Sequence, residues 1–432
     1  MQSILIVLFF IGIFLAILNP LIGLYVFLII SYIRPQDFNM FLATLEPAKW
    51  ILIVTFISFL FHTFFTTKDF VKAKQNLAII GILFFILLSR MVAIDSLGWW
   101  NATEDFLRVI LVYFLLINVL IYKGRLRKFF IFFVLINVFI AARYYLAYRT
   151  GTATYWGSKP GDVTTGFLAN ADDMGLGLVV ALPFVLIPIF YSKNIIIKGL
   201  LGIASGIFML GVLATDSRGA LLGIFAVFIG VFATQFNFKK LRYNKYAIGM
   251  AIFLVLFTGF ILKYRYTLRS QYESMQREDD SGRVGRMATW DAAKKMIRAK
   301  PLTGVGRGNF VAYWKANYPA GVFGYQVAHN VIYEVSAEIG LIGLFCFLLF
   351  SLYGLKEVAY FRKRYKEYLQ KYEFIDMLFA IYSVSLLGFF VNGMFITVAF
   401  YWHIYILVAL FVASKHIFLK EIAHEKIRQN KK

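Results

Sequence analysis

Residues 328–354 read A-H-N-V-I-Y-E-V-S-A-E-I-G-L-I-G-L-F-C-F-L-L-F-S-L-Y-G, an apolar run with a titratable histidine at its start. A bilayer core of ~30 Å requires about 20 apolar residues per helix, which this run supplies. Runs of similar length recur along most of the 432 residues, of which 60% are hydrophobic and 16% charged. Unpaired backbone groups in lipid leave helices as the practical way to cross. The sequence therefore predicts an all-α fold, a polytopic transmembrane helical bundle.

We expect about twelve spans. Their approximate ranges are 3–33, 48–66, 76–94, 104–122, 129–148, 174–191, 195–214, 219–236, 246–264, 330–354, 374–394 and 399–418. The first range is interrupted at Asn19-Pro20, so it forms either one kinked, strongly tilted helix or two short helices with Met1 on the exported side. We favour one net crossing, with both chain termini in the cytoplasm.

The net charge of +22 sets the predicted topology. Clusters of Lys and Arg recur in connectors on one side of the bundle, which by the positive-inside rule is cytoplasmic. This gives N-terminal spans over 1–264, a large periplasmic loop over 265–329, and C-terminal spans with a basic cytoplasmic tail over 330–432. The loop is also rich in Arg and Lys, but loops of this length translocate largely regardless of charge.

The large loop is expected to contain an amphipathic helix on the membrane surface. Met287, Trp290, Ala293 and Ile297 recur at helical spacing, and Pro301 ends the run.

Several classes of function find no support in the sequence. The single cysteine, Cys346, lies in an apolar segment, which excludes a disulfide framework and a thiolate metal site. There is no Gly-rich loop ending in Lys-Ser/Thr for ATP-driven transport, and no folded basic domain for nucleic acid. Glu278-Asp279-Asp280 and Asp172-Asp173 lack a recognisable ligand spacing for a divalent ion. We therefore expect no metal and no cofactor.

His329 is the candidate catalytic residue. A histidine at a helix N-terminus feels the positive end of the dipole, and nearby arginines act in the same direction. Both favour the neutral imidazole, which can accept a proton. Glu334 and Glu338 lie on other faces of the predicted helix, so we expect them to pair with bundle cations or cap neighbours. The alternative is an interfacial histidine that only hydrogen-bonds a loop.

Four arginines are candidates for binding phosphate, because guanidinium groups bind phosphate oxygens bidentately and stay charged. Arg218 lies in a polar break between two spans, Arg283 and Arg286 in G-R-V-G-R, and Arg307 in a Gly-rich stretch. Asp216 could instead neutralise Arg218, and a basic loop is often a contact with anionic lipid.

Four elements in order resemble the O-antigen ligase and polymerase superfamily of bacterial envelope glycosyltransferases. They are S-R-G-A at 217–220, R-x-x-x-W from Arg286 to Trp290, P-L-T-G-V-G-R-G-N-F at 301–310 and H-N-x9-G-x-x-G from His329. The opening N-P-L-I-G-L-Y-V-F-L-I-I-S-Y-I-R-P at 19–35 is similar to the exosortase-associated O-glycosylation ligase subgroup. The family's Asn-rich element is only loosely matched at 168–175, so no role is carried over there.

The resemblance implies a glycan donor on undecaprenyl pyrophosphate, presented at the outer leaflet of the bacterial inner membrane. Arg218 and Arg286 would hold the pyrophosphate, with Arg283 and Arg307 as further candidates. The role of Arg307 is open, because the family tolerates many residues at its position. His329 would accept the proton of the acceptor hydroxyl, in a metal-independent, inverting transfer within the membrane.

The leading interpretation is a ligase that transfers whole glycans to lipid A–core or another envelope acceptor. An O-antigen or exopolysaccharide polymerase, a protein O-oligosaccharyltransferase and a non-catalytic exporter of the glycan lipid are the alternatives.

Overall fold

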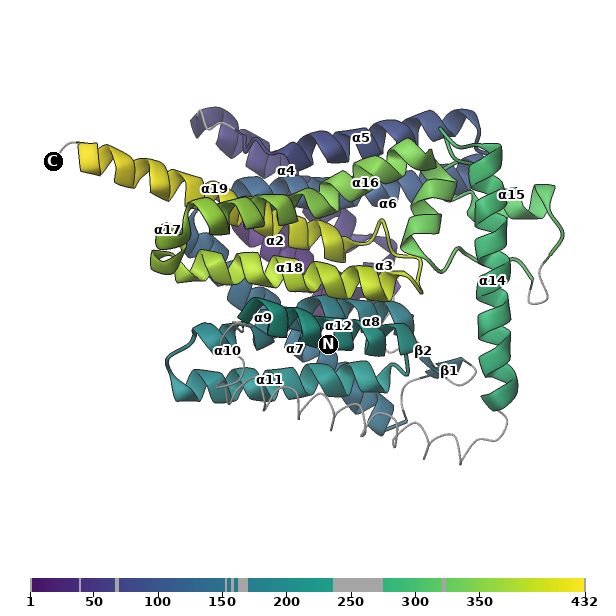
Figure 1. Ribbon diagram of the computed structural model, residues 1–432, viewed down its shortest axis with the longest axis horizontal. Coiled ribbons are helices and arrows are strands. Elements are labelled where there is room, and N and C mark those ends of the chain that lie inside the picture. The colour runs from purple at the N-terminus through teal and green to yellow at the C-terminus, as the bar shows by residue number, and fades with distance from the viewer. Residues whose placement is uncertain are drawn as a thin grey trace.

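The computed structural model describes residues 2–38, 40–66, 70–151, 154–156, 159–161, 170–235, 275–320 and 324–430. These residues form helices joined by short turns, and one two-stranded antiparallel hairpin (Figure 1). The elements are α1 Gln2–Leu18, α2 Pro20–Ile33, η1 Pro35–Phe38, α3 Met40–Thr44, α4 Pro47–Thr66, α5 Lys74–Leu88, η2 Ser89–Met91, α6 Ser96–Val119, α7 Lys123–Arg149, β1 Thr154–Trp156, β2 Lys159–Gly161, α8 Ala171–Ala181, α9 Pro183–Leu186, α10 Pro188–Tyr191, α11 Ile195–Ala214, α12 Arg218–Gln235, α14 Met275–Ala299, α15 Phe310–Asn317, α16 Val331–Arg364, α17 Lys366–Lys371, α18 Glu373–Gly393 and α19 Trp402–Asn430.

The all-α, polytopic prediction is confirmed. Nine helices of the described residues are long and apolar enough to cross a membrane, and each corresponds to one of the expected spans. The expected span at 104–122 is α6, which carries Glu104, Asp105 and Arg108 and is not among the nine. The expected span at 246–264 lies outside the described residues.

Residues 2–33 form two short helices that fold back on each other. The side chain of Asn19 accepts a hydrogen bond from Leu21 N (2.9 Å), and Pro20, which has no N–H, begins α2. A Cβ added at Gly12 would lie 2.9 Å from Val26 Cγ1, and one added at Gly23 would lie 2.9 Å from Ala16 Cβ. This antiparallel pairing is the second of the two expected arrangements, and it differs from the favoured single crossing.

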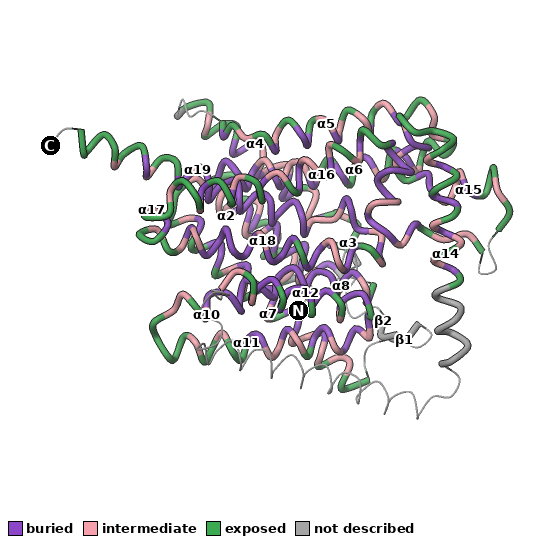
Figure 2. Tube along the Cα trace, in the orientation of Figure 1, coloured by how far each residue is buried: buried purple, intermediate pink, exposed green. Residues whose placement is uncertain are grey.

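The spanning helices differ in how far they are buried. Most residues of α19 and of the continuous α8–α10 stretch are buried, whereas most of α4 and α11 face outward (Figure 2). The bundle therefore has an inner layer of helices surrounded by helices with exposed apolar side chains.

One end of the bundle holds the starts of α8, α12 and α16 and the end of α18. A Cβ added at Gly175 of α8 would lie 2.7 Å from Ala220 Cβ of α12, and one added at Gly219 would lie 2.7 Å from Asn392 Oδ1 of α18. Helix α14 lies across this end, roughly perpendicular to the bundle helices (Figure 1). We call it the site end, because the sequence-predicted residues described below lie there.

Candidate active site

His329 lies two residues before the first helical residue of α16, as the sequence predicted. Its backbone is left-handed, with φ 46°, and its N–H donates to Thr397 Oγ1 (2.8 Å). Asn330 caps the helix by accepting from the N–H groups of Ile332 and Tyr333, and its Nδ2 donates to Met394 O (3.2 Å). The backbone of the candidate histidine is thus fixed by the segment that follows α18.

Helix α16 is broken at Gly340, whose φ is 79°. Around this break the turn from Pro301 to Gly306 bonds to the backbone of α16: Leu341 N donates to Pro301 O (2.8 Å), and Gly306 N donates to Glu338 O (3.0 Å). A Cβ at Gly340 would lie 2.2 Å from Leu302 O. The glycine therefore allows the preceding turn to approach the backbone of α16 closely.

Arg307 forms an internal ion pair instead of reaching the surface. Its Nη1 lies 2.5 Å from Glu338 Oε2, and its guanidinium carbon lies 3.9 Å from the centroid of the Phe400 ring. Burial opposes the charged form, but the carboxylates of Glu338 and Glu334 outweigh it and raise the pKa of Arg307. These contacts differ from those expected of a residue that binds substrate phosphate.

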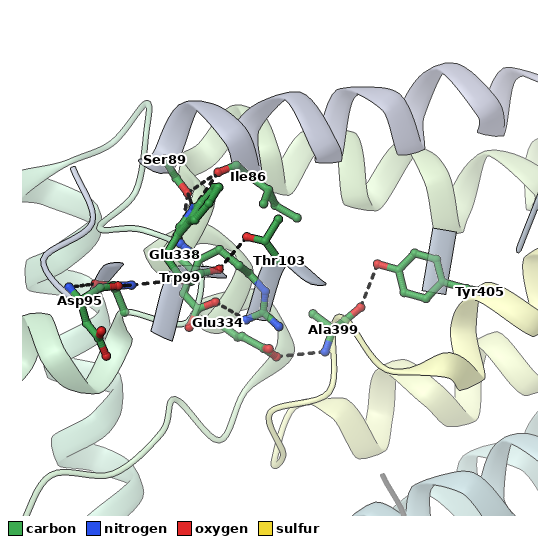
Figure 3. A network of polar contacts seen from close by, with 11 residues as sticks. Ile86, Ser89, Asp95, Trp99, Thr103, Glu334, Glu338, Ala399 and Tyr405 are labelled. Atoms are coloured by element: carbon green, nitrogen blue, oxygen red, sulfur yellow. Dashed lines mark hydrogen bonds and ion pairs between the residues drawn. The ribbon is translucent and has the colours of Figure 1, made fainter. Parts of the chain in front are cut away.

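Both glutamates of α16 have the kind of partner expected from the sequence. Glu338 pairs with the cation Arg307, and Glu334 Oε2 accepts from Ala399 N (3.0 Å). Figure 3 shows Glu334 reaching Ala399, whose carbonyl accepts from Tyr405 (3.1 Å). The prediction that these carboxylates pair with cations or cap neighbours is confirmed.

Asn309 ties the Gly-rich stretch to the start of α6. Its Oδ1 accepts from Asp95 N (2.7 Å) and its Nδ2 donates to Asp95 O (3.0 Å). Arg307 N donates to Ser89 Oγ (3.1 Å), beside Trp99, whose Nε1 donates to Ile86 O (3.1 Å; Figure 3). The 301–310 motif is therefore a rigid connector between α5, α6 and α16.

Helix α14 brings Arg286 close to His329. Thr289 Oγ1 donates to Ala328 O (3.2 Å), the carbonyl directly before the histidine. Trp290, one helical turn after Arg286, packs against Tyr333 with ring centroids 5.9 Å apart. Arg283 is on the same helix, and its side chain lies outside the described residues.

The buried face of α14 corresponds only in part to the expected stripe. Ala293 is fully buried and Trp290 and Ile297 are half-buried, but Met287 is 59% exposed.

Arg218 is the first residue of α12 and is exposed. Leu222, one turn further along α12, lines an apolar groove of about 510 Å³. The groove lies between α12 and α18, and Trp290 of α14 also lines it. Its lining residues are Leu222, Phe225, Ala226, Ile229, Trp290, Leu387, Val391, Met394 and Phe395.

Three sequence-predicted residues lie close along the chain, or through one neighbour, to residues that line this groove. Arg218 and Arg286 each lie one helical turn before a lining residue, Leu222 and Trp290 respectively. His329 is adjacent to Asn330, whose side chain bonds to the carbonyl of a third lining residue, Met394. Arg307, which pairs with Glu338, is not among the residues that line the groove.

A comparison with known families gives a match at the same part of the chain. Residues 203–348 match the family model described as O-Antigen ligase. This segment, about a third of the chain, is therefore similar to the O-antigen ligase family.

All four sequence elements that carried the resemblance lie inside the O-antigen ligase match. The stretch at 19–35 lies outside it, so its likeness to the exosortase-associated subgroup stays a prediction. No curated protein matches the chain. The match supports the resemblance to the ligase and polymerase superfamily.

In the part of the chain that the structure describes, no group of three or more His, Cys, Asp or Glu residues is arranged so that it could hold a metal ion. Of the adjacent carboxylates considered from the sequence, Asp173 is buried near the start of α8. The side chains of Glu278-Asp279-Asp280 lie outside the described residues.

Proposed function

We propose that this O-antigen ligase domain transfers a glycan en bloc from undecaprenyl pyrophosphate to an envelope acceptor such as lipid A–core, at the periplasmic face of the inner membrane. The observation that carries the proposal is an apolar groove, with two arginines one helical turn before its lining residues and a histidine next to the asparagine that bonds to Met394. A lipid-linked donor needs the same combination: an apolar surface for its tail, positive charge for its phosphates and a base at the sugar.

The groove suits part of a polyprenyl tail. Its lining is apolar, and its volume of about 510 Å³ lies within the range of ~300–1,000 Å³ typical of ligand pockets. Helices α12 and α18 supply most of its lining, and in the proposal a long tail continues from the groove into the surrounding lipid.

Arg218 and Arg286 supply the charge for the pyrophosphate. Arg218 also stands at the N-terminus of α12, where backbone N–H groups and the helix dipole favour an anion. Guanidinium groups stabilise the negative charge that grows on the leaving pyrophosphate, and this electrostatic stabilisation lowers the activation barrier. In the proposal Arg283, one turn earlier on α14, joins this pair.

His329 is the proposed general base. The acceptor oxygen forms a bond to the anomeric carbon while the bond from that carbon to the phosphate oxygen breaks. The acceptor's proton goes to the imidazole, and the lipid pyrophosphate leaves with the bonding electrons. Attack from the face opposite the leaving group inverts the anomeric configuration, and the arginines provide the charge stabilisation, so the proposed step uses no metal.

The test is transfer by the purified full-length protein, supplied with lipid-linked glycan and lipid A–core. His329→Gln is expected to lower kcat by about 10²–10⁴-fold, the usual contribution of general-base catalysis. Arg218→Gln and Arg286→Gln are expected to lower kcat/KM for the donor. Arg298→Gln is the matched control, because Arg298 is an exposed arginine in the last turn of the same α14.

Undiminished transfer by all three site variants would overturn the proposal. Product length separates the alternatives: a ligase adds one glycan to each defined acceptor, whereas a polymerase produces a ladder of repeats. A chelator should leave the rate unchanged, and complete loss of transfer would point to a metal.

A further inference from the structure

Residues 394–401, between α18 and α19, contact the candidate site through Met394, Phe395 and Thr397, and we call them the strap. We propose that the strap positions His329, with Thr397 as the positioning residue. The inference rests on the proposed function, because it assigns a role in aligning the histidine proposed as the base.

The backbone of His329 needs an external partner to hold its shape. A non-glycine residue with φ 46° is in a sparsely populated region that the surroundings must enforce. The contact recorded at its backbone nitrogen is Thr397 Oγ1, at 2.8 Å. Since the direction of the imidazole depends on this backbone, the hydroxyl of Thr397 sets where the ring can reach.

The strap is anchored on both sides of Thr397. Before it, Met394 O accepts from Asn330 Nδ2 (3.2 Å), and after it, Ala399 N donates to Glu334 Oε2 (3.0 Å). Ala399 O accepts from Tyr405 (3.1 Å), and all of Val398 to Phe400 is buried. Thr397 itself is half-buried, held between fixed neighbours.

The buried charges of α16 support the same segment. Phe400 packs against the guanidinium of Arg307 at 3.9 Å, and Arg307 in turn pairs with Glu338. Glu334 binds the strap backbone directly. These ionic groups thus hold the strap against α16.

The strap also forms part of the groove wall, through Met394 and Phe395. One segment of eight residues, 394–401, therefore fixes both the lipid groove and the backbone of His329. It sets the position of the base relative to the donor, and a misplacement of about 1 Å can cost 10²-fold in rate.

The experiment compares Thr397→Val with Thr397→Ser in the full-length protein. Valine keeps the shape of threonine and removes the hydroxyl, so kcat should fall about 10- to 100-fold while the KM for the donor stays unchanged. Serine keeps the hydroxyl and should restore most of kcat. Thermal unfolding in detergent should be the same for both, and Thr44→Val, which removes an exposed hydroxyl bonded to Phe41 O, is the control.

A wild-type kcat in Thr397→Val would overturn the inference, as would a serine variant no better than the valine variant. A loss of kcat that follows a loss of folded protein would also overturn it, since the role would then be structural. The two proposals fail differently. Full activity in His329→Gln removes the proposed base, whereas an inactive His329→Gln beside a fully active Thr397→Val removes only the positioning role.

Discussion

Removing the Arg307 guanidinium tests whether this residue stabilises the fold through its buried ion pair with Glu338. Arg307→Met keeps an unbranched side chain and takes away the cation that faces Glu338 and Glu334. Both carboxylates then stay buried, at 5% and 3% exposure, without a cation recorded beside them in the described structure. The cation–π contact with Phe400 is lost as well.

The expected cost follows from this geometry. Breaking a buried ion pair by removing one partner costs about 3–5 kcal/mol, because the remaining charge is uncompensated. The double variant Arg307→Met/Glu338→Leu leaves only Glu334, which keeps its bond to Ala399 N. Replacing a buried pair by apolar groups is often close to neutral, so the double variant should recover about half or more of the loss.

The assay is unfolding of the detergent-solubilised protein by sodium dodecyl sulfate, followed by tryptophan fluorescence. The expected order of stability is wild type, then the double variant, then Arg307→Met, with exposed Arg298→Met as a control near wild type. Wild-type stability of Arg307→Met would refute the reasoning, and so would a double variant no better than the single one. A phosphate-binding Arg307 would instead leave stability intact and weaken only donor binding.

Three further variants test the residues that surround the candidate site. Gly340→Ala should destabilise by about 2 kcal/mol or more, since φ 79° disfavours a side chain, whereas Gly199→Ala, with open space around it, should be neutral or stabilising in the same unfolding assay. Asn309→Ala should cost about 1–3 kcal/mol, because the N–H and C=O of Asp95 lose their partner. Ala226→Phe should fill the groove and raise the KM for the lipid donor while leaving unfolding unchanged, as donor titrations would measure.

Features with a local cause could be predicted from the sequence. The start of α16 after His329 follows from an asparagine cap ahead of an apolar run. The spacing of four residues predicts that Arg286 and Trp290 lie on the same side of one helix. Asn19-Pro20 predicts an interruption of the first apolar segment. The same reasoning left open whether residues 3–33 cross once or twice, because a cap and a proline fit both a kink and a reversal.

Contacts between distant parts of the chain could not be predicted. Thr397 is 68 residues from His329, and Asp95 is 214 residues from Asn309. No periodicity links such pairs, since each contact depends on how whole helices pack. For Arg307 the sequence left the role open, and its pairing with Glu338, 31 residues further along the chain, depends on the fold.

The position of the strap in the chain has a consequence for biosynthesis. A ribosome produces the arginines, α14 and His329 first, and Thr397 appears only after α18 has been made. The contact between Thr397 and His329 cannot form in any shorter nascent chain, even if the preceding helices have already folded. The histidine therefore acquires its final geometry only after α18 and the strap have been synthesised.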